Sequence, residues 1–137
     1  MKILSHRGFW REAAEKNKLV AFDYSFSLGF GTETDVRDFG GELVISHDIP
    51  NGEELRFRDF LELAESSQGI EDLPLALNIK ADGLAQRICE ELSRFPNLDI
   101  FLFDMAVPDM RTYFSTGLPV FTRMSEVELD PVWIEQS

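Results

Sequence analysis

The fold and the candidate site are both decided by the stretch GTETDVR, residues 31–37, and by the segment ELVISHD, residues 42–48, which follows it. The first stretch has the composition of a β-strand, in which alternate side chains point to the same face. Glu33 and Asp35 therefore share a face, about 7 Å apart at a rise of ~3.3 Å per residue. Such carboxylates repel each other unless a cation lies between them, so they are a candidate site for a hard divalent cation. The alternative is a solvated strand face beside Arg37.

The chain contains only two histidines, and each stands just beyond a short apolar segment of β-type composition. His6 follows residues 2–5, and His47 follows the second segment quoted above. Histidine exchanges protons near neutral pH without unusual tuning. A lone histidine is more often a core or surface residue than a catalyst, but two histidines that flank a carboxylate pair favour acid–base catalysis.

Gly40 and Gly41 separate the two β-rich segments and predict a hairpin. A two-residue turn would pair Asp35 with Ser46 and direct His47 to the opposite face. A three-residue loop with a bulge would place His47 across from Asp35 on the same face. If the carboxylates form a site, we favour the second register. A further alternative is that the two segments do not form a hairpin and that this part of the chain is an irregular connection between two parallel strands.

Composition limits the class of protein and its partners. The chain has 137 residues, 44% hydrophobic and 28% charged, which is typical of one ordinary globular domain over residues 1–137. Its net charge of −12 repels polyanions, so nucleic acid is not an expected partner, whereas a small phosphate ester can bind near local cations. The single cysteine, Cys89, excludes an internal disulfide and a cysteine-based zinc site. Without a long apolar span or a signal-peptide core, we expect a cytoplasmic location and no membrane insertion.

Along the rest of the chain, β-type segments alternate with segments of helical periodicity. We predict strands over residues 2–5, 32–37, 42–46, 73–80, 98–103 and 118–122, helices over 17–28, 54–65, 83–95 and 108–116, and a loop with the start of a helix over 128–137. This alternation implies a mainly parallel α/β sheet, in which chemistry gathers at the carboxyl ends of the strands. The polar residues near those ends, which we expect to converge on one rim, are His6, Arg7, Glu33, Asp35, His47, Asn78 and Lys80.

With these residues in view, the chain resembles the glycerophosphodiester phosphodiesterase family, within the barrel phosphodiesterases like phosphatidylinositol phospholipase C. The resemblance is carried, in order along the chain, by the segments HRG (6–8), ETDVR (33–37), GEL (41–43), HD (47–48) and NIK (78–80). A further segment, EKNKL at 15–19, is similar to the family's Pro-Glu-Asn-Thr-Leu element and keeps only Asn17 and Leu19. The resemblance implies a TIM barrel.

The resemblance also implies an activity, namely hydrolysis of a glycerophosphodiester to an alcohol and a phosphomonoester, with a role in lipid metabolism. His6 and His47 resemble the catalytic pair, as general base and general acid. Arg7 and Lys80 would contact the phosphate, where the alternative for both is a surface salt bridge. Charge on the phosphoryl oxygens would be neutralised by the cation and Arg7, and a protonated histidine would let the alkoxide leave.

The implied metal ligands are Glu33, Asp35 and Asn78, with Mg²⁺ or Ca²⁺ as the cation. Asn78 stands where the family often has a third carboxylate. An amide oxygen can still ligate either cation but brings no charge, so affinity should fall or water must complete the shell. This is the first of two departures from the family.

The second departure is length. A TIM barrel closes with eight strands and has about 250 residues, or roughly 200 in compact forms. Only six strands are predicted here, so the chain resembles a barrel that is incomplete at its C-terminal end. Open sheet edges would then favour self-association. Two alternatives to an enzyme follow: an inactive relative that holds a phosphorylated metabolite through Arg7 and Lys80, and a structural fragment that needs a partner chain.

Overall fold

The computed structural model describes residues 1–69 and 72–122, so the loop and helix start predicted for 128–137 lie outside the described residues. In chain order the elements are β1 (Leu4–His6), a short 3₁₀ helix η1 (Ala13–Glu15), α1 (Leu19–Ser27), β2 (Gly31–Phe39), β3 (Glu42–Ile45), α2 (Phe57–Ser66), β4 (Pro74–Ile79), α3 (Ala85–Leu92), β5 (Asp99–Phe103), α4 (Val107–Phe114) and β6 (Val120–Phe121). The four helices predicted between residues 17 and 116 are all found, each shorter than expected.

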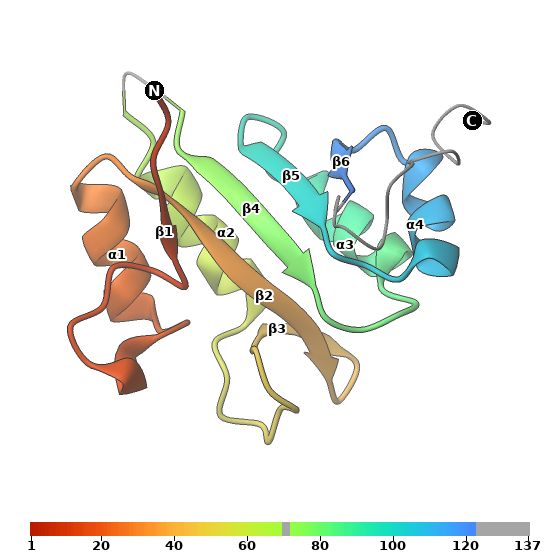
Figure 1. Ribbon diagram of the computed structural model, residues 1–137, viewed down its shortest axis with the longest axis horizontal. Helices are drawn as coiled ribbons and strands as arrows, with labels where there is room; N and C mark the ends of the chain where they lie inside the picture. The colour runs from red at the N-terminus through yellow and green to blue at the C-terminus, as the bar shows by residue number, and fades with distance from the viewer. Residues whose placement is uncertain (70–71, 123–137) are drawn as a thin grey trace, which may run out of the picture.

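Five strands form a parallel sheet in the order β1-β2-β4-β5-β6, and their carboxyl ends point the same way (Figure 1). β3 lies off this path and pairs antiparallel with the end of β2. The sheet thus has the six strands that were predicted, but β3 is the second arm of a hairpin and does not belong to the parallel series. In the described part of the chain, β1 and β6 form the two edges of the sheet and no barrel closes.

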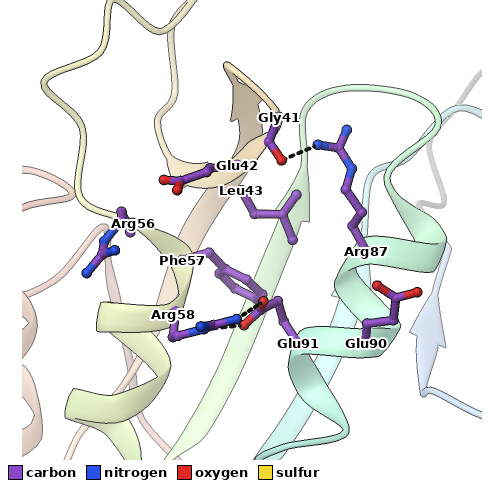
Figure 2. Close-up of a pocket in the computed structure, with 9 residues that line it drawn as sticks. All are labelled: Gly41, Glu42, Leu43, Arg56, Phe57, Arg58, Arg87, Glu90 and Glu91. Carbon is purple, nitrogen blue, oxygen red and sulfur yellow. Dashed lines mark hydrogen bonds and ion pairs between the residues drawn. The ribbon is translucent and has the colours of Figure 1, made fainter.

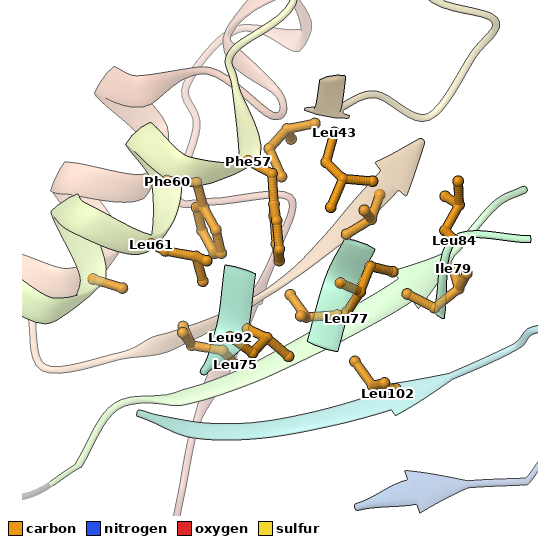
Figure 3. Packing of buried hydrophobic residues seen from close by; sticks show 14 of the residues in the cluster. Leu43, Phe57, Phe60, Leu61, Leu75, Leu77, Ile79, Leu84, Leu92 and Leu102 are labelled. Carbon is orange, nitrogen blue, oxygen red and sulfur yellow. The ribbon is translucent and has the colours of Figure 1, made fainter. Parts of the chain in front are cut away.

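The helices cover one face of this sheet, and the core lies between them. Leu75, Leu77 and Leu102 are fully buried beneath the side chains of α2 and α3 (Figure 3). Phe57 and Phe60 of α2 pack over the same strands. Because side chains alternate along a strand, the burial of these residues directs their neighbours in sequence to the open face. A slip of one residue would bury the carboxylates of β2 under the helices.

The hairpin between β2 and β3 has the register that we did not favour. Val36 pairs with Ile45 and Phe39 with Glu42, which leaves a two-residue turn of glycines. Both glycines have positive φ, 58° and 84°, as a tight hairpin turn requires. The expectation of a three-residue loop is therefore wrong. The backbone N–H of Ser46 donates to the carbonyl of Asp35 over 3.0 Å, and the strand ends there.

α1 begins at Leu19, two residues later than predicted. Asn17 is buried and has a left-handed backbone, with φ 58°, so it cannot belong to the helix. Its place before α1 leaves its amide side chain directed towards β2 instead of along a helix surface. No helix in the described residues is long and apolar enough to cross a membrane.

Candidate active site

The rim at the carboxyl ends of β1, β2 and β4 brings the predicted residues together on the open face of the sheet. The parallel register places His6 beside Glu33 and Asp35 beside Asn78 as Cα partners. Lys80 follows the last residue of β4, and its backbone N–H donates to a carbonyl of β2 over 3.0 Å. Residues that are more than 70 positions apart in sequence thus meet at one edge, as the alternation of strands and helices predicts.

Asp35 is at the centre of this rim, and only 1% of its surface is exposed. Its Oδ2 accepts a hydrogen bond from Asn17 Nδ2 over 2.9 Å and lies 3.2 Å from Arg7 Nε. Its Oδ1 lies 3.6 Å from His47 Nδ1 and 3.9 Å from Lys80 Nζ. A buried carboxylate is stable only when opposite charges and donors surround it, and these four groups supply them.

Arg7 reaches this carboxylate through an unusual turn after β1. Its backbone has φ 57°, and the N–H donates to the carbonyl of Glu33 over 2.9 Å. The next residue, Gly8, has φ 84°, and a Cβ there would lie 2.6 Å from an alanine side chain of α1. Left-handed backbone at a residue other than glycine costs of order 1–3 kcal/mol, so the surrounding contacts must hold the turn. The turn is what directs the guanidinium into the rim.

His47 reaches the same rim although it was expected to need another register. β3 ends at Ile45, and the chain after it leaves the sheet, so strand alternation no longer decides where the imidazole points. Arg37 fixes this segment by donating from Nε and Nη2 to the carbonyl of His47, over 3.1 and 2.9 Å. The imidazole Nδ1 lies 2.9 Å from Nη2 of Arg7. A guanidinium only donates, so this contact requires an unprotonated Nδ1.

Asn17 was not predicted as a site residue. Its Nδ2 donates to Asp35, and its Oδ1 accepts from the hydroxyl of Thr34 over 2.9 Å. Its backbone N–H donates to the carbonyl of Arg7 over 3.0 Å. Asn17 therefore ties β1, β2 and the start of α1 together around Asp35. The signal was present in the segment EKNKL, but the helical periodicity around it concealed the role.

Glu33 and His6 form the exposed side of the rim. Glu33 Oε2 lies 3.6 Å from His6 Nε2, whose side chain is 63% exposed. Burial, and then the nearby charge of Asp35, raises the pKa of Glu33 to about 7. Burial and the positive charge of Arg7 lower the pKa of His6. The charged form of Glu33 is therefore disfavoured in this structure, mainly because the carboxylate is removed from water.

Three oxygens of the rim are buried without a hydrogen-bond partner: Glu33 Oε2, Asp35 Oδ1 and Asn78 Oδ1. A buried polar atom without a partner costs about 1–3 kcal/mol, and such atoms are rare in folded proteins. All three belong to groups that Mg²⁺ and Ca²⁺ prefer as ligands. The described residues contain no group of three or more His, Cys, Asp or Glu side chains that could hold a metal ion. A cation at the rim would therefore depend on two carboxylates, the amide of Asn78 and water.

Lys80 is half-buried at the same rim, between two carboxylates. Its Nζ lies 3.9 Å from Asp35 Oδ1 and 3.9 Å from Asp104 Oδ2. Asp104 follows β5, has φ 66°, and was not predicted as part of the site. These distances are long for ion pairs, so the ammonium is held near the rim without a close hydrogen bond to either carboxylate.

Two of the cavities lie near the β2–β3 hairpin. One of about 450 Å³ opens beside Arg7 and His47 and is walled by residues 13–18 and 45–54. The other, of about 240 Å³, lies on the helix side, between the β2–β3 hairpin, α2 and α3 (Figure 2). In the second cavity Arg58 pairs with Glu91, over 3.0 and 2.6 Å. Only the first cavity shares residues with the rim.

Comparison with known proteins bears on the fold. No protein-family model matches the chain. No curated protein sequence matches it either. Among solved structures, the glycerophosphodiester phosphodiesterase from Agrobacterium tumefaciens str. C58 is similar, with a TM-score of 0.65 and 19% sequence identity over 84% of this chain. The chain spans 62% of that protein's length. At this identity the likeness shows the fold alone, a mixed α/β chain with a mostly parallel sheet that is consistent with a partial TIM barrel.

Proposed function

We propose that this chain is a cation-dependent phosphodiesterase that hydrolyses a small glycerophosphodiester-type substrate to an alcohol and a phosphomonoester. Fold-level likeness to a glycerophosphodiester phosphodiesterase supports the class of reaction. One observation carries the proposal further: three buried oxygens without hydrogen-bond partners lie at the rim that also holds both imidazoles of the described residues. Unpaired acceptors next to acid–base groups are an arrangement that a structural role does not need.

Glu33, Asp35 and Asn78 are the residues that would hold Mg²⁺ or Ca²⁺. A cation bound there would supply neutralisation of the charge on the phosphoryl oxygens. The site offers two carboxylates and one neutral amide, so we expect weak affinity, with water in the remaining ligand positions.

The cationic side chains of the rim would bind and orient the phosphate. Arg7 is held against Asp35 by its Nε, over 3.2 Å, and its Nη2 faces His47. A guanidinium held in this way can donate to phosphoryl oxygens without first paying for its own ordering. The ammonium of Lys80 would be a second phosphate contact from the β4 side of the rim.

The two histidines would act on the proton transfers. His6 has a lowered pKa and is therefore neutral near pH 7, the form that accepts a proton from an attacking water. His47 would protonate the leaving alkoxide, and the buried carboxylate of Asp35, 3.6 Å from its Nδ1, would stabilise the imidazolium. Because an imidazolium and a guanidinium both only donate, the Arg7 contact to Nδ1 must open in that state. Substrate phosphate is then the new partner of Arg7.

Hydrolysis of a panel of glycerophosphodiesters by the full chain, with and without chelator, tests the proposal. We expect turnover that requires Mg²⁺ or Ca²⁺ and is lost in His6→Ala and in His47→Ala. Turnover that persists in chelator, or in both variants, would contradict it.

A second candidate function is binding of a phosphorylated metabolite without hydrolysis, which the neutral amide at Asn78 favours. Thermal stabilisation by glycerol 3-phosphate, in the absence of turnover with every cation tried, would support this candidate instead. Folding that depends on protein concentration would support the third interpretation, a fragment that needs a partner chain.

A further inference from the structure

The larger of the two cavities adjoins the rim but does not contain its carboxylates. It has a volume of about 450 Å³, within the range of small-molecule sites. One wall is the segment between β1 and α1, and the opposite wall is the chain between the end of β3 and α2. Arg7 and His47 lie where this cavity meets the rim. A group that leaves the phosphorus at His47 can therefore enter this cavity directly.

Lysine side chains line the wall before α1. Lys16 and Lys18 both belong to the cavity lining, on either side of the buried Asn17. Neither forms an ion pair with another described residue.

Lys16 is held in place by an aromatic ring. Its Nζ lies 4.4 Å from the centroid of the Trp10 ring, a cation–π contact. The Trp10 indole N–H donates in turn to the carbonyl of His6 over 3.0 Å. The ring is thereby anchored to the end of β1, and the ammonium is positioned relative to the rim.

The acidic residues that line the cavity lie on the opposite wall, between β3 and α2. Glu54 accepts hydrogen bonds from the backbone N–H groups of Asn51 and Gly52, over 2.7 and 2.9 Å, so its carboxylate already has partners within its own loop. Asp48 is the other carboxylate in the wall. Glu54 also interacts electrostatically with Lys18. The two lysines and the two carboxylates therefore balance in number, and the positive charge is confined to the wall before α1.

This local charge contrasts with that of the whole chain. The net charge is −12, and the chain has only four lysines, of which Lys16, Lys18 and Lys80 lie at this end of the sheet. In a strongly acidic protein, local cations decide which anions can approach closely. The positively charged wall before α1 therefore favours a ligand with a negative charge.

We propose that the cavity walled by Lys16 and Lys18 is the subsite for the leaving alcohol, and that it selects phosphodiesters whose alcohol carries an additional anionic group, a phosphate monoester or a carboxylate. The inference rests on the proposed function. Charged groups at the end of an alcohol of three to six carbons would lie among the lysines while the phosphodiester lies at Arg7. An alcohol with a quaternary ammonium would be repelled by the same wall.

A series of three substrates that differ only in the alcohol tests this selectivity: glycerophosphocholine, glycerophosphoglycerol, and glycerophosphoglycerol that carries a terminal phosphate. With the full chain and Mg²⁺ or Ca²⁺, we expect kcat/KM to rise in that order, by about tenfold or more from the first to the last at low ionic strength. Added salt should reduce the difference, since exposed charges are screened within a Debye length of about 10 Å at 0.1 M.

Charge-reversed variants test whether Lys16 and Lys18 cause this preference among the substrates. Lys16→Glu and Lys18→Glu should each lower the ratio of kcat/KM between the phosphorylated and unphosphorylated glycerol substrates by about fivefold or more, whereas Lys16→Arg should keep it. Arg94→Glu is the matched control, because it changes the net charge equally at an exposed position beyond α3. Thermal unfolding of each variant establishes that it folds. A ratio that does not change in the lysine variants would overturn the inference.

Binding without catalysis separates this inference from the proposed function. In the presence of chelator, glycerol 3-phosphate should shift the amide NMR signals of residues 16–18 and 47–49, and more weakly in Lys16→Glu. These shifts in a chain that hydrolyses nothing would support the cavity's selectivity for an anionic group and overturn the proposed function. Hydrolysis with no preference for the anionic alcohol, and no such shifts, would overturn the inference and leave the proposed function standing.

Discussion

The rim of the sheet and the cavity between α2 and α3 both contain charged side chains, but of these two regions only the rim has buried oxygens without hydrogen-bond partners. In the helix-side cavity Arg58 forms a two-point contact with Glu91, and Arg87 donates to the carbonyl of Gly41 over 3.0 Å (Figure 2). At the rim, by contrast, buried oxygens of Glu33, Asp35 and Asn78 accept nothing. Satisfied pairs add to the packing of helices on the sheet. The unsatisfied acceptors are the observation on which the proposed cation site rests.

The largest expected effect on the rate of hydrolysis comes from the imidazoles at the rim. Replacement of His47 by alanine should lower the rate of cation-dependent hydrolysis by about 10²–10⁴-fold, the usual contribution of general acid–base catalysis. Single-turnover rates with a glycerophosphodiester measure the effect. Arg87→Ala, at the helix-side cavity, is the control and should leave that rate unchanged. An equal loss of rate in both variants would mean that catalysis does not depend on the rim more than on the helix-side cavity.

When a chelator removes divalent cations, the protonation of Glu33 should have a strong effect on the free energy of unfolding. The folded state raises its pKa from 4.5 to about 7, so folding favours the protonated form. That contribution is fully present below pH 4.5 and is lost as the pH rises through about 7. Glu33→Gln resembles the protonated form and should therefore be more stable than the wild type at pH 8, by on the order of 2–3 kcal/mol.

Denaturant unfolding at pH 5 and pH 8 checks this expectation. The variant and the wild type should differ little at the lower pH, because most Glu33 is then protonated in the folded wild type. Saturating Ca²⁺ should restore stability to the wild type at pH 8. A difference between the two proteins that does not depend on pH would show that charge is not the cause.

An additional carboxylate at the rim should strengthen the binding of a cation there. Asn78→Asp adds negative charge beside the two existing carboxylates, so affinity for Mg²⁺ or Ca²⁺ should rise by about tenfold, which corresponds to ~1.4 kcal/mol. Calorimetric titration of the cation measures it. Unchanged affinity would mean that residue 78 does not contact the ion.

The smallest effect is expected at the helix-side cavity. Arg58→Ala removes an ion pair between exposed side chains, and such pairs contribute little to stability. The unfolding midpoint and the hydrolysis rate should both stay close to those of the wild type. A large loss of activity would mean that this cavity takes part in the site.

Part of this arrangement follows from sequence periodicity. Alternation along residues 31–37 places Glu33 and Asp35 on one face, and alternating strands and helices bring strand ends to one rim. These inferences depend only on regular strands and helices, in which the direction of one side chain determines the directions of its neighbours.

The errors lie where the regular elements end. The hairpin register was wrong because we assumed that pairing continues to His47, whereas β3 ends at Ile45 and the chain then turns back towards Asp35. Asn17 was assigned to a helix because the apolar residues after it have helical spacing. Its left-handed backbone and its hydrogen bonds to two strand side chains are tertiary features that local periodicity does not encode.

Anomalous diffraction from crystals grown with Mn²⁺, which prefers the same oxygen ligands as Mg²⁺, tests the central claim most directly. The account predicts one strong peak within about 2.0–2.6 Å of oxygens from Glu33, Asp35 and Asn78. The peak should be absent in Asp35→Asn. No peak at the rim of the wild type, or one elsewhere on the surface, would contradict the claim that these unpaired oxygens form a cation site.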